Sequence, residues 1–147
     1  MNIAFIGIGN VGFPLADALA RRDHRVWIAA RDVKSSKVRE ALSLNPSLNA
    51  LPIAEAVAQA PVVFLATPFA AAEAAVREAG NLAGKILVDC TNPVAPGLTH
   101  GLDSRISGGE TIQGLAPQAK VVKAFNTYGF ENFQMMHLPL SDQAIRR

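Results

Sequence analysis

A glycine-rich turn near the N-terminus limits what this chain can fold into. The apolar run Ile3–Ile6 leads into Gly7-Ile8-Gly9-Asn10-Val11-Gly12, which has the spacing G-x-G-x-x-G, and a helical pattern over residues 11–22 follows. Glycines at this spacing are a weak signal alone, but a strand before and a helix after them are typical of a dinucleotide-binding turn. The sequence therefore predicts a strand, a tight turn and a helix that hold a pyrophosphate.

Each glycine has a separate role in such a turn. Gly7 permits the tight turn, Gly9 lets the backbone approach a pyrophosphate without a Cβ in the way, and Gly12 lets the helix pack closely on the strand. The helix N-terminus then offers free N–H groups and a partial positive charge to the phosphates. The competing interpretation is a plain strand–helix turn without a ligand. The strand–helix alternation along the chain favours the dinucleotide site.

Strands and helices are expected to alternate from end to end. Helices are predicted over residues 11–22, from 32–36 to about 44, over 53–59 and over 69–79, while residues 103–116 are expected to be loop with one or two helical turns. Strands are predicted at residues 3–6, 25–29, 49–51, 61–66, 85–89 and 120–125. This alternation implies a parallel sheet covered by helices on both faces. The expected fold class is α/β, a doubly wound parallel sheet of the Rossmann NAD(P)-binding type, in a single domain over residues 1–147.

Composition narrows the class of protein further. Half of the 147 residues are apolar and the net charge is only +2, without a basic tract, so the chain can bury a core and is not expected to bind nucleic acid. Cys90 is the only cysteine, which favours a reducing compartment. The most apolar stretch, residues 53–76, is interrupted by charged residues and prolines and is not expected to span a membrane. We expect a cytoplasmic protein.

The end of the second strand indicates which dinucleotide is bound. An NAD-binding domain normally places Asp or Glu there to hold the ribose hydroxyls, whereas this chain has Ala29-Ala30-Arg31. A guanidinium can stack on adenine and pair with a 2′-phosphate, which predicts NADP. In the competing interpretations Asp32 is the ribose acid, displaced by one residue, or Arg31 is only a solvated charge. Further donors follow just downstream: Lys34, Ser35, Ser36 and Lys37.

Polar side chains also follow three later strands. In an open parallel sheet, ligands bind at the carboxyl ends of the strands, so these residues are expected to share one pocket that faces the nicotinamide riboside or a substrate. The alternative is that they only cap strands and start turns. The residues are Thr67-Pro68 after the strand at 61–66, Asn92 after the strand at 85–89, and Asn126-Thr127 after the strand at 120–125.

No catalytic side chain and no metal site is predicted. Cys90 has no partner that indicates a thiolate, and it is expected to be a core residue. The three histidines are dispersed and give no metal-ligand spacing. Hydride transfer between a nicotinamide and another redox ring needs no protein nucleophile, because the protein supplies placement and electrostatics.

Four segments together resemble a known family. They are Ile3–Gly12, Ala30–Asp32, the string Val88-Asp89-Cys90-Thr91-Asn92-Pro93 and the string Val121-Val122-Lys123-Ala124-Phe125-Asn126-Thr127. This set resembles the NADP oxidoreductases that use the deazaflavin coenzyme F420, and the related reductase domains of membrane ferric reductases, over nearly all of residues 1 to about 130. The resemblance implies reversible hydride transfer between NADPH and a deazaflavin or flavin-like acceptor.

The resemblance also implies residue roles. Gly7, Gly9, Asn10 and Val11 would line the pyrophosphate, and Arg31 would take the 2′-phosphate. The residues expected to flank the ribose and nicotinamide are Thr67, Pro68 and Asn92, while Asn126 and Thr127 would border the deazaflavin.

The C-terminus departs from the family pattern. Members usually continue for tens of residues to complete the cleft and the dimer, and Ser141–Arg147 does not resemble that continuation. We expect the usual extension to be absent. The chain would then be a truncated form, a minimal relative, or one that completes its site as a homodimer. Two alternatives stay open. The chain is a non-catalytic NADP-binding module or subunit, or it is a reductase similar to the 3-hydroxyacid dehydrogenases, because Gly9–Pro14 resembles the opening segment of that family.

Overall fold

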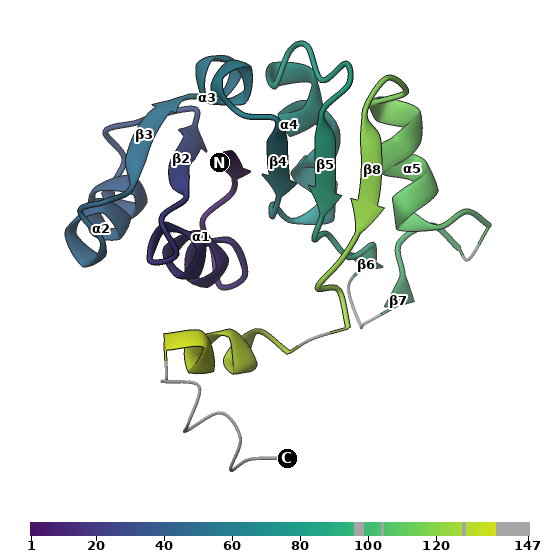
Figure 1. Cartoon of the computed structure of the whole chain (residues 1–147). Coiled ribbons are helices and arrows are strands. Elements are labelled where there is room, and N and C mark those ends of the chain that lie inside the picture. Colours follow the sequence, from purple (N-terminus) through teal and green to yellow (C-terminus); the bar gives the residue numbers. More distant parts are fainter. Residues whose placement is uncertain (96–98, 104, 128, 138–147) are drawn as a thin grey trace.

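A computed structural model describes residues 1–95, 99–103, 105–127 and 129–137. Six parallel strands form one sheet in the order β3-β2-β1-β4-β5-β8 (Figure 1). The chain adds β2 and β3 on one side of β1, then crosses back and adds β4, β5 and β8 on the other side. The strands are β1 (Asn2–Ile6), β2 (Arg25–Ala30), β3 (Asn49–Pro52), β4 (Val62–Leu65), β5 (Ile86–Asp89) and β8 (Lys120–Lys123). The predicted doubly wound α/β fold is confirmed, and each predicted strand ends within two residues of the observed one.

Helices cover both faces of the sheet. The buried cluster on one face includes residues of α3 (Ile53–Gln59), α4 (Ala72–Glu78) and α5 (Gly108–Leu115). The cluster on the other face includes residues of α1 (Gly12–Ala20), α2 (Ser36–Leu44) and the 3-10 helix η3 (Phe130–His137). Burial on both faces explains why β1 is apolar at successive positions: Ala4 and Ile6 pack into the first cluster, and Ile3 and Phe5 pack into the second.

Several elements differ from the sequence-based expectation. Residues 103–116, expected to be loop with one or two helical turns, contain the eight-residue helix α5, which is slightly more than two turns. A short antiparallel ribbon of β6 (Val94–Ala95) and β7 (Thr99–His100) was not predicted, and neither was η3 in the tail. The region predicted as one helix over 69–79 is a 3-10 turn, η1 (Phe69–Ala71), followed by α4. The expectation for Ser141–Arg147 lies outside the described residues.

The tail returns to the sheet through aromatic packing. Phe133 of η3 is fully buried, and its ring meets that of Phe125 edge-on at 5.9 Å. Phe125 in turn stacks on Phe64 of β4 at 6.4 Å. Within the part of the chain that is described, no helix has both the length and the apolar character needed to cross a lipid bilayer.

Candidate functional site

The glycine turn between β1 and α1 has the tight geometry that its sequence predicts. Gly7 has φ +96°, in the left-handed region, and a Cβ there would lie 2.6 Å from the Ala66 carbonyl oxygen. A Cβ on Gly12 would overlap the Gly7 carbonyl oxygen, because α1 packs directly on the turn. A Cβ on Gly9 would meet nothing within 4 Å. Gly7 and Gly12 are therefore required by the fold, whereas the space over Gly9 is open to a ligand.

The first turn of α1 suits an anion. It carries no acidic residue that would repel a phosphate or occupy its place. Val11 is the N-cap residue of this helix, and its side chain accepts no hydrogen bond from the first backbone N–H groups. Asn10 is exposed just before it. The helix N-terminus thus presents backbone dipole and amide groups to the open side of the turn.

Four of the strand ends meet at one edge of the sheet. The ladder of backbone hydrogen bonds continues past the strands themselves, so the residues that follow β4, β5 and β8 stay next to the end of the preceding strand in the sheet. The bonds are Ala66 N to Ile6 O at 2.8 Å, Cys90 N to Leu65 O at 3.0 Å, and Ala124 N to Asp89 O at 3.0 Å. This is the edge at which open α/β sheets bind ligands.

A cavity of about 310 Å³ opens at this edge between the ends of β1, β2 and β4. We call it the β2–β4 cavity. Its floor is largely apolar, formed by residues such as Ile28, Ala29 and Ala75, with a few polar groups around them, as is usual for ligand sites. It brings together five of the residues predicted from the sequence: Gly7, Arg31, Ser35, Thr67 and Pro68.

Thr67 lines the β2–β4 cavity, and its hydroxyl is buried without a hydrogen-bond partner within the described residues. Trp27 Nε1 is the other buried side-chain atom of this kind in the described part of the chain. A buried hydroxyl without a partner is costly, so such an atom indicates a site where another group completes the hydrogen bond. Ser35, by contrast, already caps α2, since its Oγ accepts a hydrogen bond from Val38 N at 3.4 Å.

The two candidate residues at the end of β2 have different partners. The Asp32 carboxylate accepts a hydrogen bond from the Lys34 backbone N–H at 2.8 Å, so it holds its own turn. Arg31 reaches across to α4, where its Nε donates to Glu78 Oε2 at 2.7 Å. Asp32 is thus partly committed to local structure, and Arg31 is held at the rim of the β2–β4 cavity.

A second cavity of about 380 Å³ lies on the α2 side of the glycine turn. Gly9 and Asn10 line it together with Phe13, Lys37 and Phe130. Lys37 also lines the β2–β4 cavity, so the two cavities adjoin along the turn. Of the residues predicted to bind the pyrophosphate, Gly7, Gly9 and Asn10 therefore lie where the two cavities adjoin. Lys37, which the sequence analysis names as a further donor, lies next to them.

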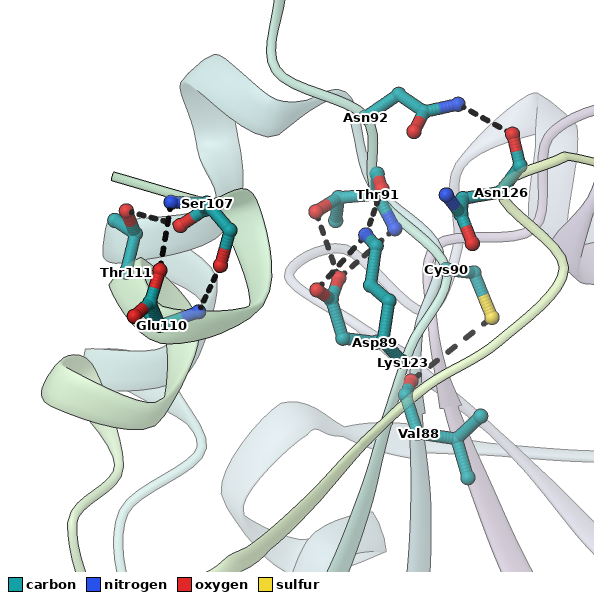
Figure 2. Close-up of polar contacts among 10 residues, drawn as sticks. All are labelled: Val88, Asp89, Cys90, Thr91, Asn92, Ser107, Glu110, Thr111, Lys123 and Asn126. Atoms are coloured by element: carbon teal, nitrogen blue, oxygen red, sulfur yellow. Dashed lines mark hydrogen bonds and ion pairs between the residues drawn. The ribbon is translucent and has the colours of Figure 1, made fainter. Parts of the chain in front are cut away.

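A charged network is buried where β5 and β8 end (Figure 2). Asp89 is fully buried, and it is the register partner of Lys123 on the neighbouring strand. Lys123 Nζ lies 2.9 Å from Asp89 Oδ2 and also donates to the Thr91 carbonyl. The other carboxylate oxygen accepts from Thr91 N at 2.9 Å and from Thr91 Oγ1 at 2.7 Å. This network fixes the backbone that leads into Asn92.

Asn92 and Asn126, predicted to share a pocket, are joined directly. Asn92 Nδ2 donates to the Asn126 carbonyl at 2.9 Å, as Figure 2 shows. The preceding residue, Phe125, has φ +67°, a strained conformation for an aromatic residue that turns the chain at the end of β8. Asn126 and the exposed Thr127 thus lie beside the end of β5, but they do not line the β2–β4 cavity.

Cys90 is a buried, protonated thiol. Burial, with the nearby Asp89 carboxylate, raises its pKa to about 12, and Lys123 offsets only part of this. A thiol with that pKa carries almost no thiolate at neutral pH, so Cys90 has none of the character of a nucleophile. This agrees with the prediction of a core residue.

Sequence reasoning missed three contributors to this edge. Asp89 and Lys123 appear in the sequence analysis only within the segments that carry the family resemblance, without a role of their own, and Glu78 is given no role. The lysine in the otherwise apolar run 121–125, three residues before Asn126, is a signal that could have pointed to the network. The contact between Arg31 and Glu78 joins residues 47 positions apart and has no local signal.

Comparisons with known proteins agree with this geometry. The sequence profile of the family described as NADP oxidoreductase, coenzyme F420-dependent, matches residues 2–93. The metalloreductase STEAP3 of Rattus norvegicus is 32% identical over 125 residues, which cover 84% of this chain and 24% of the rat protein. This chain therefore spans about a quarter of that relative.

Solved structures show the same fold. A candidate F420-dependent NADP-reductase from Arthrobacter sp. FB24 has a TM-score of 0.82 and 38% identity, and a hypothetical protein from Sinorhizobium meliloti has 0.79 and 30%. Each match covers 90% of this chain and 65% of the other chain. A pyrroline carboxylate reductase of Plasmodium falciparum with NADP bound matches at 14% identity with a TM-score of 0.55, which is a likeness of fold alone.

Proposed function

Because this chain belongs to the NADP oxidoreductase, coenzyme F420-dependent family, we propose that it binds NADP and serves hydride transfer between NADPH and a deazaflavin or flavin-like acceptor. The adenosine part of the dinucleotide occupies the β2–β4 cavity. Its pyrophosphate lies over Gly9 at the N-terminus of α1, and the nicotinamide extends toward the edge at Thr67 and Asn92.

One observation carries the choice of NADP over NAD. At the end of β2, where an acid would hold the ribose hydroxyls, Arg31 stands on the rim of the β2–β4 cavity. Asp32, the competing candidate, has its carboxylate bonded to the Lys34 backbone. A guanidinium at this position can donate two parallel hydrogen bonds to a 2′-phosphate and attracts its negative charge, whereas a carboxylate would repel the phosphate.

The residues present fit such a dinucleotide. Thr67, whose hydroxyl has no hydrogen-bond partner within the described residues, lines the cavity, and the open space over Gly9 admits a phosphate. When bound, NADPH supplies the hydride. This chain's residues bind and orient: Arg31 holds the 2′-phosphate, Thr67 donates to the ligand, and the Asn92–Asn126 hydrogen bond shapes the border where the acceptor ring would stack.

A ring-shaped hydride acceptor suits this edge better than a carbonyl substrate. Reduction of a carbonyl requires a proton donor beside the reacting oxygen. Of the ionisable groups that the structure describes where β5 and β8 end, Lys123 is bound to Asp89 and the Thr91 carbonyl, and Cys90 is a protonated buried thiol (Figure 2). A flavin or deazaflavin needs only placement against the nicotinamide. Both F420 and flavin acceptors therefore belong in the test.

The test is turnover with a panel of acceptors. The purified protein is mixed with NADPH under anaerobic conditions and with oxidised F420, FMN or FAD in turn, and the loss of NADPH absorbance is followed. Oxidation of NADPH with one acceptor, at a rate that depends on protein concentration, supports the proposal. Tight NADPH binding by calorimetry without turnover on any acceptor would instead support a non-catalytic NADP-binding module. No binding of NADPH would reject both.

A further inference from the structure

We propose that Glu78 is a specificity-determining residue: it positions Arg31 so that the two terminal nitrogens of the guanidinium face the adenosine 2′-phosphate. This inference rests on the proposed binding of NADP and concerns a residue of α4 that lies outside the cavity. Arg31 Nε donates to Glu78 Oε2 at 2.7 Å, and this pair ties the end of β2 to the end of α4.

The direction of this contact leaves the ligand side of Arg31 open. Glu78 does not line the β2–β4 cavity. It lines a separate, open hollow of about 660 Å³ on the outer side of α4, which it shares with Arg31. Arg31 therefore borders both spaces and is held from the side that faces away from the cavity.

The atoms used by the pair also suit a phosphate. Guanidinium groups recognise phosphate through two parallel N–H donors. Because Glu78 accepts the Nε–H, the terminal nitrogens Nη1 and Nη2 are left for a ligand. A carboxylate on the terminal nitrogens would instead have competed with the phosphate for the same donors.

Helix α4 also forms a wall of the cavity. Ala71, which directly precedes the helix, and Ala75 line the β2–β4 cavity, and Glu78 follows Ala75 by about one turn at the end of the helix, where it borders the outer hollow. The helix thus sets the width of the cavity and, one turn further on, the orientation of the arginine that closes it.

The pair is exposed, so its value lies in orientation. The Arg31 and Glu78 side chains are 61% and 40% exposed, and an ion pair of that kind adds little to folding stability. An unpaired arginine side chain has many rotamers, and ordering it on binding weakens the affinity for the ligand. A contact that orders Arg31 beforehand removes that cost for NADPH and changes nothing for NADH.

The test compares Glu78→Gln with Glu78→Ala by calorimetric titration of NADPH and of NADH into the full chain. Both variants lack the carboxylate charge, but only glutamine keeps an oxygen that can accept the Nε–H. We expect the alanine variant to bind NADPH about two- to tenfold more weakly than the glutamine variant, the effect of ordering one side chain. NADH should bind equally to both.

The chain offers a matched control on the same helix. Glu73 pairs with Arg77 at 2.6 Å and is similarly exposed, but it does not contact Arg31. Glu73→Gln and Glu73→Ala should therefore bind NADPH alike. In an Arg31→Ala background, the difference between the two Glu78 variants should vanish.

The possible failures are distinct. Equal NADPH affinity of the two Glu78 variants, or tighter binding by the alanine variant, would overturn the positioning role while leaving NADP binding intact. A wild-type protein that does not bind NADPH would overturn the proposed function itself and this inference with it.

Discussion

Replacing Lys123 with methionine tests whether the buried network at the ends of β5 and β8 is as important as its geometry implies. Methionine keeps the length and apolar volume of the stem but removes the ammonium group. The fully buried Asp89 carboxylate would then keep only its two hydrogen bonds from Thr91. Removing one partner of a buried ion pair costs about 3–5 kcal/mol, because the remaining charge stays buried.

The lower end of that range applies here. The Lys123 side chain is 28% exposed, so water can reach part of the site, and we expect a loss of about 3 kcal/mol. For a chain of this size that corresponds to a fall in Tm of about 6–12 °C. The double variant Asp89→Asn/Lys123→Met removes both charges and leaves an acceptor for Thr91, so it should be more stable than the single Lys123 variant.

Equilibrium urea unfolding of the wild type, both single variants and the double variant gives the coupling energy. We expect a coupling of about 2 kcal/mol or more, in line with direct contact inside one network. A loss below about 1 kcal/mol for Lys123→Met, with additive single changes, would place the pair among ordinary surface ion pairs and refute the reasoning.

Three further outcomes are expected. Gly9→Val should abolish NADPH binding by calorimetry with little loss of stability, because a Cβ there meets nothing, whereas Gly12→Ala should be strongly destabilised by overlap with the Gly7 carbonyl; retained binding by the Gly9 variant would remove the turn from the site. Cys90, with its pKa raised to about 12, should resist alkylation by iodoacetamide at pH 8 in the folded protein and react after denaturation, and rapid labelling of the native form would contradict its burial. The hydrogen bonds from Ser107 lower the pKa of Glu110, so the stabilising effect of this carboxylate is present above its unfolded pKa and is lost as the pH falls through the folded pKa. On acidification, the urea midpoint of Glu110→Gln should therefore fall less than that of the wild type. Parallel changes in the two midpoints would count against the capping box.

Local patterns were sufficient to predict the framework of the fold. The apolar run before Gly7 predicted a strand buried on both faces, and the helix at Ile53–Gln59 was predicted with its observed bounds. Helix α5 was underestimated because two glycines follow its N-cap, and glycine disfavours helix. The Ser107-x-x-Glu110 capping box was its readable signal, and the structure shows both of its hydrogen bonds.

Part of the candidate site could be predicted from the sequence. Gly7, Arg31 and Thr67 could be assigned to one ligand from their places at strand ends, and the β2–β4 cavity brings them together. The partners that orient them depend on tertiary packing: Glu78 meets Arg31 only because α4 lies beside the end of β2. Their binding roles stay predictions, as do those of Asn92, Asn126 and Thr127.

The most direct test of the account is the affinity of wild type and Arg31→Ala for NADPH and for NADH, measured by calorimetry, with Arg77→Ala as a control for the loss of a nearby positive charge. The wild type should prefer NADPH, and Arg31→Ala should weaken NADPH by about 1–3 kcal/mol, the worth of a charge-assisted contact, while NADH changes little. Arg77→Ala should keep the preference. Equal losses for both dinucleotides in Arg31→Ala, or a wild type without preference for NADPH, would contradict the assignment of the 2′-phosphate to Arg31.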